Sequence, residues 1–272
     1  MPSTDISPEQ SAVITNNYIG ETTFANMRND ATGFAVDTTP DNNYYSPGIV
    51  RGLYFSTSTY NHKPILQDYD LSGIPAGSTI TAVTFKVKGA TMLNLGGGMV
   101  TYTARDADAI ILEGTFGSSI ATGDIDSFTG YTSGWDASDV TEYTSNWGPA
   151  AGGWSTSDFN SISLNATGIA AANSALNGGT RLKFWIGEYE SWYLNDDSFF
   201  NAAYKVSRMN GHYDLGNSDS PFITVTYTEA AIVPARLRVK SGTMNLKGGS
   251  VVIKWYILIF ILNKEKIYVN NF

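Results

Sequence analysis

The chain contains no cysteine and few charged residues. Without cysteine it can form no disulfide bond, thiolate nucleophile or cysteine-ligated zinc site. Only 15% of its 272 residues are charged, so the surface must be built largely from Thr, Ser, Asn, Gly and Tyr. With 42% hydrophobic and 13% aromatic residues, the chain is too apolar to be intrinsically disordered.

Basic clusters and targeting signals are also missing. The net charge is −8 and no basic cluster interrupts the main body, so nucleic acid is disfavoured as a partner. The polar N-terminal residues lack the basic and apolar regions of a secretory signal peptide. For a location outside a cell we would therefore expect lysis, a dedicated secretion system, or a signal on a longer native sequence. The apolar run 251–262 is interrupted by Lys254 and is shorter than the ~20 residues of a spanning helix, so we predict no membrane span.

The chain has two histidines, His62 and His212, and neither is accompanied by a Gly-x-Ser-x-Gly nucleophile motif. We interpret both as ordinary hydrogen-bonding loop residues rather than members of a catalytic triad. Residues 96–98 are glycines without a following lysine, which indicates a turn and not a phosphate-binding loop.

Short alternating apolar runs separated by turn residues predict an all-β sandwich over residues 33–229. The clearest run has Val83, Phe85 and Val87 on one face of a strand and polar residues on the other. A turn at 74–77 precedes it. Similar alternation marks strands at 182–186 and 223–227, while residues 1–32 are expected to form an N-terminal arm or a first edge strand.

One segment has helical instead of strand periodicity. Ile169, Ala172, Asn173 and Leu176 fall on one helical face, and residues 177–179 (NGG) provide a stop. We therefore predict one short helix near 169–176 that crosses an end of the sandwich.

Three segments resemble the DNRLRE-type jelly-roll domains, which are carbohydrate-binding-module-like domains of bacterial and archaeal surface proteins. They are residues 69–83 (YDLSGIPAGSTITAV), 163–173 (SLNATGIAAAN) and 220–228 (SPFITVTYT). The resemblance spans roughly residues 30–229 and implies a jelly-roll sandwich with a habit of binding or display, but no activity. The chain departs from the family at Gln67, where a basic residue is common, and in a Trp-rich insertion at 131–160.

Beyond the body, residues 230–254 contain a turn-and-short-strand pattern that occurs twice at a period of seven. Such units cannot bury their apolar sides alone, so they favour stacking or trimerisation as in a β-prism or fibre. The alternative, a single hairpin at the chain end, stays open. The residues that we assign to oligomerisation are Lys240, Gly242, Leu246, Lys247, Gly249 and Ile253.

The last segment, 255–272, differs in composition from the rest of the chain. It is rich in Ile, Asn, Lys, Phe and Tyr and has no Gly, Ala, Pro, Ser, Thr, Asp or Arg. Our hypothesis is that it is translated from a formerly non-coding tail that begins at Trp255. If it is made, it should dock as a buried strand, because exposed it would promote aggregation.

Exposed aromatic side chains are the strongest indication of binding, because they stack on sugar rings and anchor protein interfaces. The alternative is that they belong to the core, and we expect this for at least half of the aromatic residues between 131 and 154. The candidates for glycan or partner binding are Tyr131, Trp135, Trp154, Trp192 and Tyr193.

Carboxylates offer a weaker indication of chemistry. Glu188 and Glu190 are placed on one strand face, near Asp196 and Asp197, where two carboxylates could act as the acid and base of a glycosidase. We favour a solvated strand face instead and predict no catalytic residue.

Calcium is the one cofactor with any signal in the sequence. The pairs Asp106/Asp108 and Asp124/Asp126 supply oxygen ligands of the kind Ca²⁺ takes, but neither matches the EF-hand loop. We therefore assign no cofactor and no metal ligand.

These features favour a non-catalytic structural or display protein of a virus particle, such as a phage decoration, head-fibre or tail-associated protein. We expect a virion or extracellular location, homo-oligomers, and other virion or surface proteins as partners, with surface glycans as further ligands. One alternative is a carbohydrate-binding module of a bacterial surface protein. A second is a glycoside hydrolase or lyase that uses Glu188 or Glu190.

Overall fold

The structure is a computed structural model of the chain. It describes residues 1–16, 23–29, 31, 33–38, 47–54, 57–90, 103–132, 134–202, 204–209, 211–213, 215–216 and 218–230. The chain divides into two units after Ala230, and the helices and strands of the described residues all belong to the first, Met1–Ala230. The predicted short-strand repeat and the hydrophobic tail lie in Ala231–Phe272, outside the described residues.

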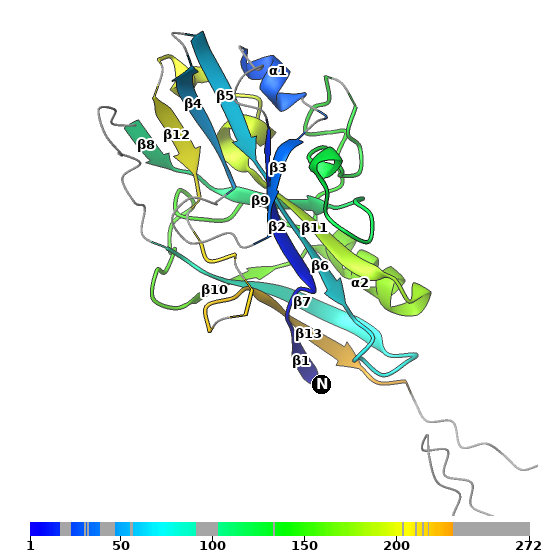
Figure 1. The fold of residues 1–272 in the computed structure, drawn as a ribbon. Helices are drawn as coiled ribbons and strands as arrows, with labels where there is room; N and C mark the ends of the chain where they lie inside the picture. Colours follow the sequence, from blue (N-terminus) through cyan, green and yellow to red (C-terminus); the bar gives the residue numbers. More distant parts are fainter. Residues whose placement is uncertain are drawn as a thin grey trace, which may run out of the picture. The chain divides into compact units, whose positions relative to one another are not determined.

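One sheet, sheet A, has four antiparallel strands in the order β1-β13-β7-β10 (Figure 1). The predicted strand at 83–87 lies inside β7, and the predicted last core strand lies inside β13, between β1 and β7. Short strands form the two edges, which limits the unpaired backbone available for unwanted pairing. The strands are β1 (Ser3–Ile6), β7 (Thr79–Lys88), β10 (Phe159–Ser163) and β13 (Phe222–Thr228).

A second sheet, sheet B, has five antiparallel strands in the order β3-β2-β6-β11-β9. The expectation that residues 1–32 form only an arm or edge strand is wrong for β2, which lies inside the sheet between β3 and β6. Ala12, Val13 and Ile14 are buried there, and this burial places the strand in the interior. The strands are β2 (Gln10–Asn16), β3 (Gly33–Asp37), β6 (Ile65–Asp70), β9 (Ala109–Glu113) and β11 (Arg181–Glu188).

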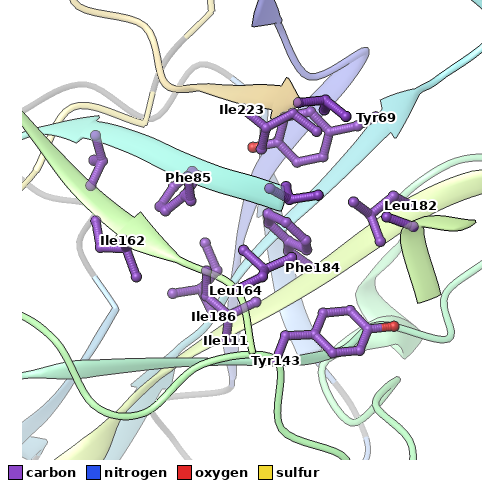
Figure 2. Close-up of a cluster of buried hydrophobic side chains, with 14 of the residues drawn as sticks. Tyr69, Phe85, Ile111, Tyr143, Ile162, Leu164, Leu182, Phe184, Ile186 and Ile223 are labelled. Atoms are coloured by element: carbon purple, nitrogen blue, oxygen red, sulfur yellow. The ribbon is translucent and has the colours of Figure 1, made fainter. Parts of the chain in front are cut away.

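The main hydrophobic core lies between sheets A and B (Figure 2). Phe85 from β7 makes an edge-to-face contact with Phe184 from β11, with ring centroids 5.9 Å apart. The predicted inward residues of β7, β11 and β13 are all buried, as period-2 alternation requires. These residues are Val83, Phe85, Val87, Leu182, Phe184, Ile186, Ile223, Val225 and Tyr227.

The predicted helix is confirmed as α2 (Ala166–Gly178) and is longer than expected. Asn165 caps its N-terminus by accepting a hydrogen bond from the Gly168 amide, and Gly179 ends it in the left-handed conformation. Asn173, the polar residue on its inner face, exchanges two hydrogen bonds with the backbone of Ile80 in β7. The helix is thereby fastened to the start of a strand of sheet A.

Sheet B is buried on both faces, because adjacent residues of its strands enter two different cores. Val13 and Ile65 face sheet A, whereas their neighbours Ile14 and Leu66 enter a second hydrophobic core. This explains the unbroken apolar run 109–112 in β9, which no alternating pattern predicts. The Trp-rich insertion contributes to this second core through Trp135.

A third sheet, sheet C, borders the second core and has the strand order β5-β4-β12-β8. Its β12 and β8 are parallel and the other pairs are antiparallel. The chain passes from sheet C into sheet B twice, through Pro64 after β5 and through residues 107–108 after β8. The strands are β4 (Gly48–Tyr54), β5 (Thr57–Lys63), β8 (Thr103–Asp106) and β12 (Lys205–Arg208).

The all-β sandwich with a short helix is therefore confirmed. The chain crosses between sheets A and B at the β1–β2, β6–β7, β9–β10 and β10–β11 connections, as it does in jelly rolls. Several short helical elements were not predicted: α1 (Phe24–Arg28), η1 (Thr122–Asp124), η2 (Tyr189–Tyr193) and η3 (Ser198–Phe200). None of the helices in the described part of the chain is long and apolar enough to span a membrane.

Candidate functional site

The most unusual polar cluster in the described residues lies where β11 ends. Glu188 is the last residue of β11, and Tyr189–Tyr193 form a π-helical turn, η2. The prediction that Glu188 and Glu190 share a strand face is wrong, since the backbone leaves the strand between them. π-Helical turns are rare, and those inside α-helices are frequently found at functional sites. This turn follows a strand, and the buried carboxylate of Glu188 at its start makes it the candidate site.

Glu188 is fully buried, so it does not lie on the solvated strand face that the sequence analysis favoured. One carboxylate oxygen accepts the backbone amides of Ser191 and Trp192, at 2.8 and 2.7 Å. The other accepts the Ser207 hydroxyl of β12, at 2.5 Å. Burial nevertheless raises the pKa of Glu188 to about 7, against the lowering effect of these hydrogen bonds. The side chain thus joins the turn to sheet C and can change its charge near neutral pH.

Arg105 of β8 is the cation nearest to this carboxylate in the described structure, with Nη2 3.6 Å from Glu188 Oε1. That separation is longer than a direct charge-assisted hydrogen bond, so Arg105 offsets the burial only in part. Its guanidinium donates instead to the hydroxyls of Ser207 and Ser191, at 2.8 and 2.5 Å. It also lies over the ring of Phe199, 4.5 Å from the centroid, and 28% of its side chain is exposed. Arg105 therefore connects the buried carboxylate to the surface.

A second carboxylate, Glu190, is turned toward the corner between β8 and β9. Both of its oxygens accept the backbone amide of Asp108, at 3.0 and 2.8 Å. Burial raises its pKa, and the Asp108 charge acts in the same direction. Both Glu188 and Glu190 accept hydrogen bonds from backbone amides. These hydrogen bonds give both carboxylates a structural role.

One aspartate of each pair considered for calcium has structural partners. Asp108 accepts hydrogen bonds from the Asn146 side chain and the Ala151 amide, both at 2.8 Å. Asp124 accepts the Ala121 amide and the Ser127 hydroxyl. In the described ranges, no three His, Asp or Glu side chains are grouped as metal ligands.

Three of the five predicted binding aromatics are buried in the second core. Trp135 and Trp192 are each 1% exposed and lie 4.5 Å apart between ring centroids, and Tyr193 packs on Trp135. The expectation that these rings form exposed plates is wrong. The second face of sheet B needs apolar cover, and the Trp-rich insertion and the η2 turn supply it.

The other two aromatic candidates are half-buried and do not lie together. Tyr131 packs on Phe128 at the second core and donates a hydrogen bond to the Asn29 carbonyl. Trp154 packs on Trp147 at the main core. The structure therefore does not bring the five residues into a single aromatic platform.

The histidines differ in environment. His62 is not a loop residue but lies in β5, buried against Trp192. Burial lowers its pKa to about 3, and the nearby Arg28 charge acts in the same direction. His212 lies outside the strands, with its amide donating to the Lys88 carbonyl and its ring 3.9 Å from Asp219.

Arg105 and Ser207 were not predicted as partners of Glu188. Each belongs to a short strand of sheet C, separated from Glu188 by 83 and 19 residues respectively, and no local pattern links them. The one available signal was the apolar run 184–187 before Glu188, which is typical of a strand buried on both faces.

An aromatic pair on the solvent face of sheet A was not predicted from the sequence either. Phe159 of β10 and Phe222 of β13 meet across β7, with ring centroids 5.1 Å apart and planes at 69°.

The predicted oligomerisation residues 240–253 lie outside the described residues. No protein-family model matches the chain, and no curated protein sequence matches it.

Proposed function

We propose that the chain is a non-catalytic structural or display protein of a virus particle, of the decoration, head-fibre or tail-associated kind. The described unit is a sandwich, and the chain has no cysteine and few charges. In the sequence it is followed by the two copies of the turn-and-short-strand repeat, which begin at Lys240 and Lys247. Stacking of such repeats would join copies of the chain, and the sandwich would present surfaces to other virion proteins or to surface glycans.

The observation that carries the proposal is the solvent face of sheet A. Phe222 and Phe159 lie opposite Lys86 and Lys88 of β7 in the strand register. Both lysines are engaged: Lys86 donates to Ser161, and Lys88 pairs with Asp219 at 2.8 Å. An aromatic centre with a polar, largely neutral rim is the usual composition of a partner-contacting surface.

The hydrogen bonds of Glu188 and Glu190 also support a non-catalytic reading. A glycosidase needs one carboxyl group to donate a proton and another to attack or activate water beside the substrate. Here both carboxylates accept backbone amides, and Glu188 is fully buried. A structural role therefore accounts for these hydrogen bonds, and no bound substrate is needed to explain them.

The size of the full-length protein in solution tests the assembly part of the proposal. Light scattering and electron microscopy should find a defined homo-oligomer, such as a trimer. Replacing Leu246 and Ile253 together by Asp should reduce it to monomers, because both apolar repeat positions would become charged. The matched control is Leu237→Asp, an apolar residue outside the repeats, which should leave the oligomer intact. A monomeric wild-type chain would contradict the assembly proposal.

A carbohydrate-binding module is the second candidate, and the Phe159–Phe222 pair favours it, because aromatic rings stack on sugars. Binding of the full chain to a glycan panel would then be lost in the Phe159→Ala/Phe222→Ala double variant. Phe199→Ala, a half-buried phenylalanine away from sheet A, is the control that should still bind. A wild-type chain that binds no glycan would remove this candidate.

A further inference from the structure

The Glu188 cluster has an arrangement that a purely structural anchor does not need. Its carboxylate is fully buried, while the guanidinium next to it reaches the surface. Ser207 lies between them, accepting from Arg105 Nε at 2.8 Å and donating to Glu188 Oε1 at 2.5 Å. The charge on Glu188 is thereby linked through one hydroxyl to an exposed cation.

We propose that Glu188, Ser207 and Arg105 form a proton-operated latch, in which the charged Glu188 holds Arg105 over the ring of Phe199 and protonation of Glu188 loosens Arg105, so that its guanidinium opens to solvent more often. The latch goes beyond the proposed display function and does not depend on it. It makes the surface at Arg105, Phe199 and Lys205 a pH-responsive contact site.

The mechanism follows from the donors and acceptors of the cluster. With Glu188 charged, the Ser207 hydrogen points to the carboxylate, and the lone pairs of Ser207 are available to Arg105. When Glu188 Oε1 takes a proton from solvent, the carboxylic acid becomes the donor to Ser207. The Ser207 hydrogen then turns away from Glu188, and its second lone pair can still accept from Arg105 Nε. The same step removes the ion pair between Glu188 and Arg105, so only the neutral hydroxyls of Ser207 and Ser191 and the ring of Phe199 still hold the guanidinium.

The turn itself should remain in place during this change. The second oxygen of Glu188 can still accept the amides of Ser191 and Trp192 when the group is neutral. Trp192 is also tied by its carbonyl, which accepts Arg28 Nε at 2.8 Å. The response is therefore confined to Arg105 and the ring that it covers.

The surface that would respond to pH consists of Arg105 and Lys205, which both lie against the ring of Phe199. Lys205 of β12 lies 5.2 Å from the Phe199 centroid, and Arg105 lies 4.5 Å from it. Cation–π contacts at exposed sites are individually weak. Once Glu188 no longer attracts it, Arg105 can therefore exchange this contact for an acidic group on a partner.

Other titratable groups face the cluster and have to be separated from Glu188. Glu190 and Asp108 adjoin it from the η2 turn and the β8–β9 corner. Asp196 feels the Arg105 charge, but hydrogen bonds from Ser198 lower its pKa, so it stays charged in mild acid. His62 and Arg28 lie on the far side of Trp192, and the lowered pKa of His62 keeps it neutral in the same range.

Hydrogen exchange of the arginine Nε–H groups, followed by nuclear magnetic resonance on the full-length chain, tests the latch. The protection factor of Arg105 Nε–H should fall about tenfold between pH 8 and pH 5.5, as expected when the guanidinium loses the attraction of the nearby carboxylate charge. The Arg28 Nε–H group is the internal reference, because its acceptor is a backbone carbonyl that does not titrate. In Glu188→Gln, the Arg105 protection should be low and independent of pH.

Two matched variants separate Glu188 from other carboxylates. Glu113→Gln, at the far end of β9, should retain the wild-type pH dependence. Glu190→Gln should keep the pH-dependent loss of protection but move it to lower pH, because, besides burial, the Glu190 charge helps to raise the pKa of Glu188. Constant Arg105 protection in the wild type would overturn the proposal without reference to any variant. It would also be overturned if Glu188→Gln kept the pH dependence or if Glu190→Gln removed it. Far-UV circular dichroism confirms that each variant is folded.

Discussion

The imidazole of His62 stacks on the indole of Trp192, with ring centroids 5.0 Å apart and ring planes at 11°. His62 belongs to β5 of sheet C, and Trp192 to the η2 turn after β11 of sheet B. The stack therefore joins two sheets across the second core. The backbone of the same turn is also held by Glu188. Two titratable groups, the acid Glu188 and the base His62, therefore support the η2 turn.

The first prediction concerns Glu188→Gln. The folded-state pKa of Glu188 is raised from 4.5 to about 7, so the folded protein binds more protons than the unfolded chain between these values. Its contribution to stability is complete below pH 4.5 and is lost as the pH rises through 7. Glutamine removes the buried charge. At pH 8 it should therefore raise the free energy of unfolding by on the order of 1–3 kcal/mol.

Urea denaturation of the wild type and Glu188→Gln at pH 5 and pH 8 measures this effect. The variant should gain at pH 8 and show little difference at pH 5. Equal destabilisation at both pH values would mean that the charged form is the stabilising one. The same variant, assayed on a glycan panel, tests the hydrolase alternative, which requires turnover by the wild type and its loss in the variant.

The second prediction concerns His62→Phe. The folded-state pKa of His62 is lowered from 6.5 to about 3, so the unfolded chain binds the extra proton. The contribution of His62 is present above pH 6.5 and is lost as the pH falls toward 3. For the wild type, this amounts to up to about 3 kcal/mol between pH 6.5 and pH 4.

Phenylalanine keeps an aromatic ring against Trp192 but does not titrate. Denaturation at pH 6.5 and pH 4 should therefore show a smaller acid-induced loss in His62→Phe than in the wild type. His212→Phe is the control, because this ring is only partly buried and lies outside the second core. An identical loss in the wild type and His62→Phe would show that His62 protonates without unfolding the core.

The third prediction distinguishes core aromatics from surface aromatics. Trp192→Ala removes a 1% exposed ring that contacts Trp135 and Trp185, and should destabilise the protein by about 3–5 kcal/mol. Trp154→Ala removes a half-buried ring and should cost less. Thermal unfolding followed by calorimetry measures both. If Trp192→Ala were well tolerated and lost only ligand binding, the ring would have to be a binding plate after all.

The fourth prediction uses two glycines with left-handed backbone. Gly130 has φ +93°, and a Cβ there would lie 1.7 Å from the Asp139 carbonyl oxygen, far closer than van der Waals contact allows. Gly152 has φ +87° but open space around it. Gly152→Ala should cost about 1 kcal/mol from backbone strain alone, whereas Gly130→Ala should cost several times as much.

Denaturant midpoints of the two variants give the comparison directly, because both replace glycine by alanine at a positive φ. The difference between them reports the close approach of Gly130 to the backbone of Asp139. Similar midpoints would indicate that residues 130 and 139 do not approach each other as closely as the structure places them.

Local patterns predicted the elements whose signal lies in neighbouring residues. The alternation in β7, the C-terminal stop of α2 and the turn before β7 all depend on residues within one strand or one helical turn, and all are found. The alternation of 182–186 and 223–227 likewise placed β11 and β13. The family resemblance remains a prediction.

The candidate site could not be predicted in the same way. Glu188 and Glu190 lie two residues apart, which in a continuing strand places them on one face. The strand instead ends at Glu188, because the Ser191 and Trp192 amides are captured by its own side chain. Burial of that side chain depends on sheet C, whose strands come from three separate regions of the chain.

For the aromatic residues, too, local sequence predicted one property and the tertiary structure decided another. Their number and clustering are visible in the sequence, but a buried ring and an exposed ring have the same local pattern in a loop. Trp135 is buried because sheet B has a second apolar face that needs cover, and that face exists only once five separate strands have paired.

The sequence by itself determined the fold class, the inward face of the main strands, and the approximate position and C-terminal stop of α2. These features follow from the period of the side chains along one strand or one helix. Only the tertiary structure decided which polar residues are buried, because burial depends on contacts between distant segments. The meeting of β8, β11 and β12 places Arg105 and Ser207 beside Glu188, and the burial that results raises the pKa of Glu188 toward neutrality.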